Sequence, residues 1–320
     1  MEVFIDLKVK SQYSNTITKE APLIVVKTEK VEDLKKKIIC NFKLNIKSHR
    51  LGLSIINSNN KKIFLSQDSL TLEEYNFKDG IKVVVKDLGP QVGWRFVYVV
   101  EYIGPLLIFS LFYFFFNYNK SNVFLNNISF VMVAFHYSKR IFESIFIHKF
   151  SRNYMPLTNL FINTTYYWLL FGLLNGYNIY MNTTNNFESN NVFNFLLNSK
   201  ENYNGIANYL RTIMIIIFFF AEYKNFKCHE VLKLLKVNNN GKRGIPYGHG
   251  FDLITCANYF WEFISWLSFS LYINHWSSYL FCFAGLYIMS KWALDKHRNI
   301  KKLFGSKYPG KRKAIIPYIL

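Results

Sequence analysis

Apolar and polar residues alternate through the first 88 residues of the chain. Every second position from Val3 to Val9 is apolar, which is typical of a strand with one buried face. Further short apolar runs predict strands at 24–26, 51–56, 63–65 and 81–85. This region is therefore expected to contain a sheet.

One stretch of the same region has a helical pattern instead. Apolar residues lie three and four apart in 31–39, with acidic residues in the first turn and lysines after them. Thr28 is expected to cap this helix, a helical turn is expected at 72–75, and Asp79-Gly80 marks a turn. This order of elements resembles the ubiquitin-like β-grasp fold. Residues 1–88 are thus predicted to form an α+β module, a cytosolic docking or stability domain.

After Asp87 the pattern changes to long apolar and aromatic runs. Glu101 is the only charged residue in the first of them. Most of the runs are long enough to cross a bilayer as a helix. Residues 89–320 are therefore predicted to form a mainly α, multi-span transmembrane bundle of about five to seven helices. The expected spans are 96–116, 123–135, 157–181, 206–222, 251–273 and 276–294.

The basic residues lie beside these apolar runs. The chain has 39 Lys and Arg against 20 Asp and Glu, a net charge of +19. The basic residues gather at 139–152, 224–243 and 291–313, whereas 182–199 has none. Basic flanks that stay in the cytosol explain this pattern better than nucleic-acid binding does. The amino terminus has no signal-peptide core, so the internal spans are expected to direct membrane insertion.

The sequence lacks the motifs of several common sites. The four cysteines are scattered, the seven histidines are not clustered, and no Walker or Gly-x-Ser-x-Gly motif occurs. Gly248-His249-Gly250 has two glycines of a dinucleotide fingerprint, but Leu253 stands in place of the third. Neither a metal centre nor a Rossmann domain is expected.

Polar side chains inside or beside the apolar runs mark a candidate site. Asn258 and Glu262 are four residues apart and share a helical face, as do His136, Arg140 and Glu143. Ionisable groups in a membrane are costly and are functional candidates by default. The alternative is that these residues are satisfied packing polars, with Arg140 and Glu143 forming a simple ion pair.

The basic loops offer groups suited to a ligand with phosphates. Asn225 and His229 follow one apolar run, Arg243 precedes the next, and His297-Arg298 follow the last. Arg binds phosphate oxygens through a planar pair of donors, so a phosphate-rich cofactor would use several such residues. Solvated membrane flanks would carry similar charge.

Short motifs occur in order along essentially the whole chain. They are Gly89-Pro90-Gln91, 100–105, 136–140, 155–157, 166–168, 255–259 and the ending Tyr308-Pro309 to Ile316-Pro317. Together they resemble the very-long-chain trans-2-enoyl-CoA reductases of the endoplasmic reticulum, in the steroid 5α-reductase superfamily. That family also carries a ubiquitin-like amino-terminal module. Ala257 departs from a frequent Pro, and Gly305-Ser306-Lys307 departs from a segment that usually holds an acid.

The resemblance implies NADPH-dependent reduction of a trans-2-enoyl-CoA to a saturated acyl-CoA, the last step of very-long-chain fatty-acid elongation. It implies that Glu101 and Tyr137 polarise the thioester carbonyl, as a Glu and a Tyr do in the steroid reductases. Tyr259 is the expected proton donor to the α-carbon, and Gln91 is expected to assist binding or orientation. The residues expected around NADPH are Arg140, Asn225, His229, Arg243, Asn258, Glu262, His297 and Arg298.

Other readings stay open. A steroid or polyprenol reductase of the same superfamily would share the cofactor site, and a non-catalytic membrane scaffold would use the β-grasp module to recruit partners. Tyr259 as a packing aromatic and Glu101 as a packing polar bound to Tyr137 are the structural alternatives. The expected location is the endoplasmic reticulum membrane, with the amino-terminal module and cofactor site facing the cytosol and other elongation enzymes as partners.

Overall fold

The chain forms two compact units. The structure, a computed structural model, describes residues 2–10, 16–56, 62–65, 67–117, 123–149, 153–181, 203–239 and 244–320. One unit takes in residues 1–97 and 150–161, and the other residues 98–149 and 162–320. The domain boundary at residue 88 stays a prediction.

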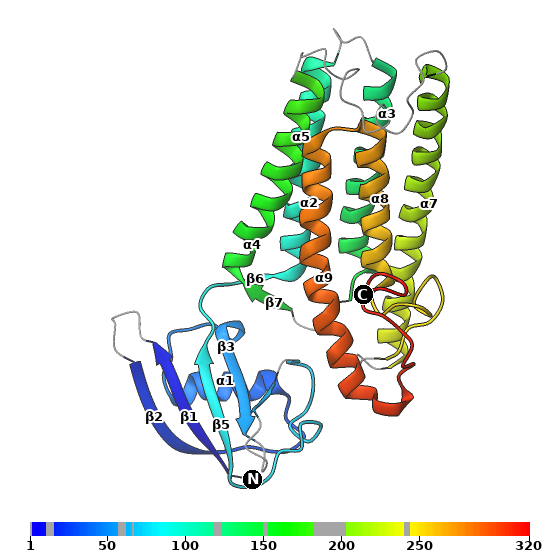
Figure 1. The fold of residues 1–320 in the computed structure, drawn as a ribbon. Coiled ribbons are helices and arrows are strands. Elements are labelled where there is room, and N and C mark those ends of the chain that lie inside the picture. Colours follow the sequence, from blue (N-terminus) through cyan, green and yellow to red (C-terminus); the bar gives the residue numbers. More distant parts are fainter. Residues whose placement is uncertain are drawn as a thin grey trace. The chain divides into compact units, whose positions relative to one another are not determined.

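The first unit is built on a five-stranded sheet (Figure 1). β1 (Glu2–Lys10) pairs antiparallel with β2 (Thr16–Ile24) and parallel with β5 (Ile81–Asp87). β3 (Leu51–Ile56) pairs antiparallel with both β5 and β4 (Lys62–Phe64). The strand order is therefore β2-β1-β5-β3-β4, with the parallel pair at the centre.

The core of this unit lies between the sheet and α1 (Val31–Asn41). Val31, Leu34 and Ile38 come from one face of the helix and are fully buried with Val3 and Ile5. Burial of these apolar side chains supplies most of the stability of such a fold. The strand order and the packed helix agree with the predicted α+β, ubiquitin-like β-grasp fold.

Local details of this unit differ from the sequence-based expectations. Lys30 occupies the N-cap position of α1, and its side chain makes no capping bond. The expected Thr28 cap was wrong because a turn between β2 and α1 takes up Thr28. The strand expected at 24–26 overlaps β2 only at Ile24. The smaller elements are η1 (Ser48–Arg50) and a two-stranded sheet of β6 (Gln91–Gly93) and β7 (Tyr154–Pro156).

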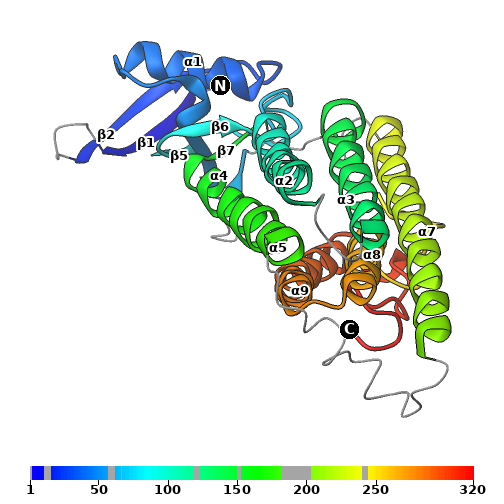
Figure 2. The same cartoon turned by 90° about the horizontal axis from the view of Figure 1, so that it is seen from above.

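Long helices make up most of the second unit (Figure 2). They are α2 (Trp94–Phe116), which begins in the first unit, α3 (Val123–Phe142), α7 (Tyr203–Asn238), α8 (Ala257–Ile273) and α9 (Trp276–Phe304). α8 packs against α3, α7 and α9, so it lies among the other helices. This position places Asn258 and Glu262 inside the unit.

A further helical run contains π-helical turns. It comprises α4 (Leu157–Thr164), η3 (Thr165–Leu173), α5 (Leu174–Gly176) and η4 (Tyr177–Met181). A π-helical segment η2 (Glu143–Ile147) continues α3, and the 3₁₀ turn η5 (Gly305–Lys307) follows α9. π-Helical turns are rare and are often found at functional sites.

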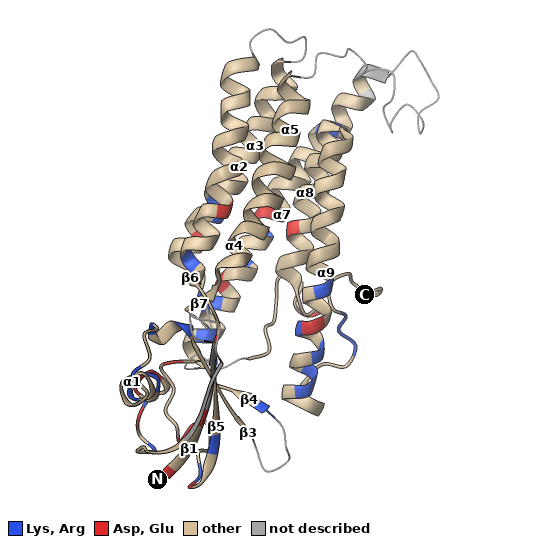
Figure 3. Ribbon diagram, turned by 90° about the vertical axis from the view of Figure 1, so that its left-hand side faces the viewer, with Lys and Arg blue, Asp and Glu red and all other residues tan. Residues whose placement is uncertain are grey.

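Among the described residues, α2 is the one helix long and apolar enough to cross a membrane by length and composition. The mainly helical character is confirmed, whereas the multi-span bundle stays a prediction. The apolar run 251–273 is not helical throughout. Residues 251–256 form turns, and Ile254 bridges to Lys313, so α8 begins only at Ala257. Charged residues of the second unit gather mostly toward the end where α9 finishes (Figure 3).

Candidate functional site

Arg140 lies at the centre of a buried polar cluster in the second unit. It is on α3, where its Nη1 donates to Glu143 Oε2 at 2.7 Å and its Nη2 donates to the Tyr102 hydroxyl at 2.7 Å. Arg140 Nη1 also lies 3.3 Å from His229 Nδ1 on α7. These contacts confirm the ion pair that the spacing of Arg140 and Glu143 predicts, and they join α2, α3 and α7.

A second group of charges connects α3 with α7. Glu222 is 1% exposed, and its Oε1 lies 2.7 Å from His136 Nδ1. Its other oxygen lies 2.8 Å from Lys139 Nζ. A buried carboxylate needs such partners because desolvation of an unpaired charge is costly. The Lys139 ammonium and the His136 ring therefore account for Glu222 at this depth.

Asn225 joins these charges to α8. Its amide donates to the carbonyl oxygen of Asn258 at 2.8 Å and to Glu262 Oε2 at 3.1 Å, and it accepts from Lys139 Nζ at 2.6 Å. The contact to Asn258 is made by its backbone carbonyl, whereas Glu262, one turn later on α8, directs its side chain toward α7. Glu262 Oε1 also lies 3.4 Å from His136 Nε2. The members of this polar cluster are Tyr102, His136, Lys139, Arg140, Glu143, Glu222, Asn225, His229, Asn258 and Glu262.

Glu101 and Tyr137 lie beside the cluster. Glu101 is 2% exposed, and its Oε2 accepts from Asn163 Nδ2 at 2.8 Å. Tyr137 is fully buried against the rings of Tyr102, Phe171 and Trp266, but its hydroxyl has no hydrogen-bond partner among the described residues. A buried hydroxyl without a hydrogen-bond partner lowers the stability of the protein unless a ligand binds to it.

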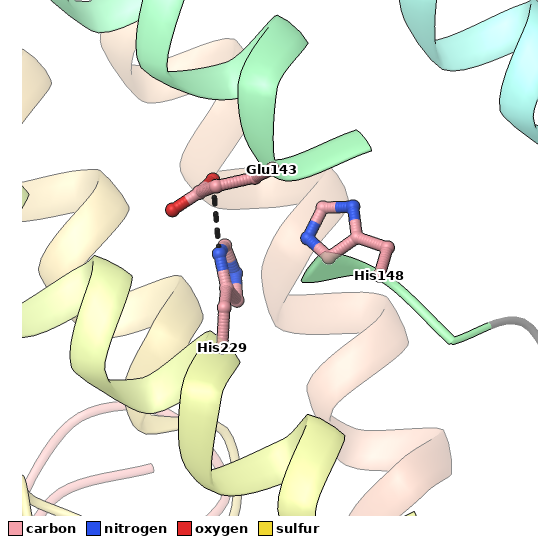
Figure 4. A group of neighbouring side chains, drawn as sticks. All are labelled: Glu143, His148 and His229. Carbon is pink, nitrogen blue, oxygen red and sulfur yellow. Dashed lines mark ion pairs between the residues drawn. The ribbon is translucent and has the colours of Figure 1, made fainter. Parts of the chain in front are cut away.

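Glu143, His148 and His229 lie close together, and Glu143 Oε2 is 3.0 Å from His229 Nδ1 (Figure 4). Burial lowers the pKa of His148 to about 2 and also lowers that of His229. Burial alone would raise the pKa of Glu143, but His229, Lys139 and Arg140 hold it well below its usual range. Glu143 is therefore ionised and both imidazoles are neutral near pH 7.

The ligand atoms of these three residues lie within 4.8 Å of one another, which is close enough for a metal ion. However, Arg140 lies 2.7 Å and Lys139 3.6 Å from the Glu143 carboxylate. A divalent cation would share its only carboxylate ligand with two positive charges. The arrangement therefore does not favour a metal ion.

Tyr259 faces a different side of α8 from Asn258. Lys296 on α9 donates to its hydroxyl at 2.7 Å, and the Lys296 ammonium lies 4.4 Å from the centre of its ring. The Tyr259 ring also lies 6.4 Å from that of Trp292. No hydrogen bond joins Tyr259 to Glu101 or Tyr137 in the described part of the chain, so Tyr259 has surroundings of its own.

The remaining expected site residues are spread out. His297 Nδ1 pairs with the Thr255 hydroxyl, whereas Arg298 is exposed and lies 3.8 Å from Asp295. Gln91 belongs to the first unit, where its side-chain amide donates to Leu88 O at 3.0 Å. Arg243 falls outside the residues that the structure describes.

Sequence reasoning missed Glu222 and Asn163 and assigned no role to Tyr102, Lys139 or Lys296. A signal for Glu222 is present, because Glu222, Asn225 and His229 are three and four residues apart and share one face of a helix. Asn163 has no comparable local signal. Its contact with Glu101 joins residues 62 apart in the chain.

The sequence matches known proteins over both units. Residues 153–320 match a family described as 3-oxo-5-alpha-steroid 4-dehydrogenase, and residues 4–92 match a ubiquitin-like domain family. A very-long-chain enoyl-CoA reductase of Dictyostelium discoideum is 32% identical over 99% of this chain and 100% of its own length. A Schizosaccharomyces pombe protein, provisionally named an enoyl reductase, is 40% identical over 78% of this chain and 80% of its own. The solved ubiquitin-like domain of an Arabidopsis thaliana protein covers 28% of this chain and 80% of its own, with 25% identity and a TM-score of 0.21.

Proposed function

The chain belongs to the very-long-chain enoyl-CoA reductase family of the steroid 5α-reductase superfamily, and we propose that it reduces trans-2-enoyl-CoA thioesters to saturated acyl-CoA. The observation that carries this proposal is the buried Tyr137 hydroxyl, which lacks a hydrogen-bond partner among the described residues and lies beside the polar cluster. A donor in this state can bind an oxygen on which negative charge develops.

The family implies a nicotinamide cofactor, which when bound supplies a hydride to the β-carbon of the substrate. The residues present fit such a group. Besides Tyr137, the buried Nε atoms of Arg140 and Arg312 have no hydrogen-bond partner among the described residues. Unpaired buried donors of this kind favour an anionic or polar ligand. Arg140, Asn225, His229, Asn258 and Glu262 are the residues proposed to hold it.

The reaction places negative charge on the thioester oxygen, and the chain must stabilise it. Tyr137 is proposed to donate a hydrogen bond to this oxygen, with Glu101 as a second polarising group when protonated. Asn163 holds the Glu101 carboxyl in place through its 2.8 Å hydrogen bond. Loss of one donor to such an oxyanion costs about 10² to 10³ in rate.

Tyr259 is proposed to donate the proton that the α-carbon takes up. General-acid help of this kind contributes about 10² to 10⁴ in rate. NADPH is proposed as the cofactor because exposed basic residues can meet a further phosphate, such as Arg298, whose side chain is 67% exposed and lies 3.8 Å from Asp295. Gln91, His297 and Arg243 stay in the proposal as residues that assist binding.

The proposed setting is the endoplasmic reticulum membrane, with the β-grasp module and cofactor site on the cytosolic side. Support comes from the apolar helix α2 and from basic residues beside the other apolar runs. Other fatty-acid elongation enzymes are the proposed partners, because the substrate is the product of their dehydration step.

The proposal is tested by measuring NADPH oxidation by the detergent-purified protein in the presence of a long-chain trans-2-enoyl-CoA. The saturated product is identified by mass spectrometry. In Tyr137→Phe, kcat is expected to fall by about 10²- to 10³-fold. The melting temperature of this variant should stay the same or rise, because the substitution removes a buried hydroxyl that has no hydrogen-bond partner among the described residues.

Tyr180→Phe is the matched control. Its hydroxyl is also buried but lies 3.0 Å from Ser129 Oγ, so this variant should lose stability and keep kcat. Reduction of steroid enones or polyprenols, but not of enoyl thioesters, would show that the protein is a steroid or polyprenol reductase of the same superfamily. Absence of NADPH binding would favour the non-catalytic scaffold instead.

A further inference from the structure

A lysine contacts the hydroxyl of the proposed proton donor. Lys296 Nζ lies 2.7 Å from the Tyr259 oxygen and 4.4 Å from the centre of the same ring. The contact joins α8 to α9, between residues 37 apart in the chain. Charge-assisted hydrogen bonds of this length are among the stronger ones in proteins, so the pair has a defined geometry.

A second lysine on α9 shows what is particular about this contact. Lys291 is exposed like Lys296, and its ammonium lies 4.3 Å from the centre of the Tyr287 ring. Both lysines therefore make cation–π contacts with a tyrosine. Only the Lys296 contact involves a residue proposed to take part in the reaction.

We infer that Lys296 is a positioning residue that orients Tyr259, stabilises the oxygen left after Tyr259 gives up its proton, and returns a proton to it. This inference rests on the proposed function, since it gives a role to the partner of the proposed donor. An ammonium group at hydrogen-bond distance stabilises a phenolate more than a phenol, because only the phenolate carries a full negative charge.

The proton balance closes with the reductant already named. Two electrons and one hydrogen reach the β-carbon from the nicotinamide cofactor, and the carbon–carbon double bond is reduced. The O–H bond of Tyr259 then breaks as a C–H bond forms at the α-carbon. An N–H bond of Lys296 breaks as the Tyr259 O–H bond forms again, and the lysine amine takes a proton from water.

Burial supports this route. Tyr259 is half-buried at the amino-terminal end of α8, whereas Lys296 is exposed on α9. The hydrogen bond between them is exposed, so Lys296 can exchange protons with water. The ring of Trp292, one turn before Lys296 on α9, lies 6.4 Å from the Tyr259 ring.

The experiment compares Lys296→Met with Lys291→Met in the full-length protein in detergent. Lys296→Met keeps most of the apolar stem but removes the ammonium, and kcat is expected to fall about 10- to 100-fold with little change in KM. Lys291→Met should keep the wild-type kcat. NADPH affinity by fluorescence titration and the melting temperature should be unchanged in both variants.

Chemical rescue separates a charge effect from a structural one. Ethylamine added to Lys296→Ala is expected to restore part of kcat and to leave Tyr259→Phe unchanged. Rescue supports the inference even if the Met variant is less stable. Equal activity of Lys296→Met and Lys291→Met, or failure of the amine to rescue Lys296→Ala, would overturn it. Failure of the wild-type protein to reduce any enoyl thioester would instead overturn the proposed function.

Discussion

Glu222 is a buried acid whose charge depends on its partners. It is 1% exposed between His136 and Lys139, whereas Glu230, two turns later on α7, pairs with Lys227 at the surface. Water screens the surface pair but not the buried one. The two glutamates therefore test how much the polar cluster contributes to stability.

Glu222→Gln is expected to destabilise the second unit by about 3 kcal/mol, because it leaves the Lys139 ammonium buried with less compensating charge. Glu230→Gln, the control on the same helix, should change the free energy of unfolding by about 0–1 kcal/mol. Denaturant titration in detergent measures both. Similar small losses in the two variants would mean that Glu222 is not needed to neutralise the cluster.

His148 makes stability depend on pH. Its pKa is lowered from 6.5 to about 2, chiefly by burial. The unfolded chain recovers the ordinary value and binds the proton first, so stability is full above pH 6.5 and falls as the pH drops. The loss at pH 5.5 is about 1.4 kcal/mol for this one group. The free energy of unfolding of wild type should fall between pH 7.5 and pH 5.5. In His148→Phe this fall should be smaller by about 1.4 kcal/mol. An unchanged difference would contradict the assignment to His148.

At the scale of elements, α2 and η3 approach each other at a glycine. A Cβ atom on Gly104 would lie 1.9 Å from Trp168 Nε1, and that indole nitrogen donates to Val100 O at 3.0 Å. The absence of a side chain therefore lets the indole bind the backbone of α2. This contact positions the helix that carries Glu101.

Gly104→Ala is expected to destabilise the protein by about 1–3 kcal/mol and to lower activity, because Trp168 must move and α2 with it. Gly205→Ala on α7 is the control, since its Cβ meets no atom within 4 Å. Alanine there should be neutral or stabilising by up to about 1 kcal/mol. The two variants are compared by thermal melting and by NADPH oxidation. Equal melting temperatures would contradict the close approach of Trp168 to Gly104.

At the scale of the whole molecule, the ubiquitin-like fold has a core of its own. The buried apolar residues of this core all lie between Val3 and Val85. None of them comes from the second unit. A domain with its own core is able to fold alone, although a small one is only marginally stable.

A fragment of residues 1–88 is therefore expected to unfold cooperatively and to give a dispersed amide NMR spectrum. Leu34, which is fully buried in α1, supplies the check. Leu34→Ala in the fragment should cost about 2–5 kcal/mol and abolish the cooperative transition. A fragment with a collapsed, undispersed spectrum would show that the first unit needs residues beyond 88.

Local pattern in the sequence was enough to predict most of the long elements, though not all of their ends. Alternation from Val3 to Val9 became β1, the three-and-four spacing in 31–39 became α1, and most of the apolar runs became long helices. These features depend on neighbours within a few residues, so periodicity reveals them. Ordered motifs along the chain were also enough to identify the family, which the comparisons confirmed.

Only the tertiary structure decided which polar side chains meet. Glu222 and His136 are 86 residues apart, and Tyr259 and Lys296 are 37 apart. Such pairs depend on how each helix is rotated against its neighbours, and sequence spacing within one helix does not carry that information. For the same reason, Asn258 and Tyr259 are adjacent in sequence but face different partners, and the tertiary structure supplies both the Tyr137 environment and the Lys296 contact.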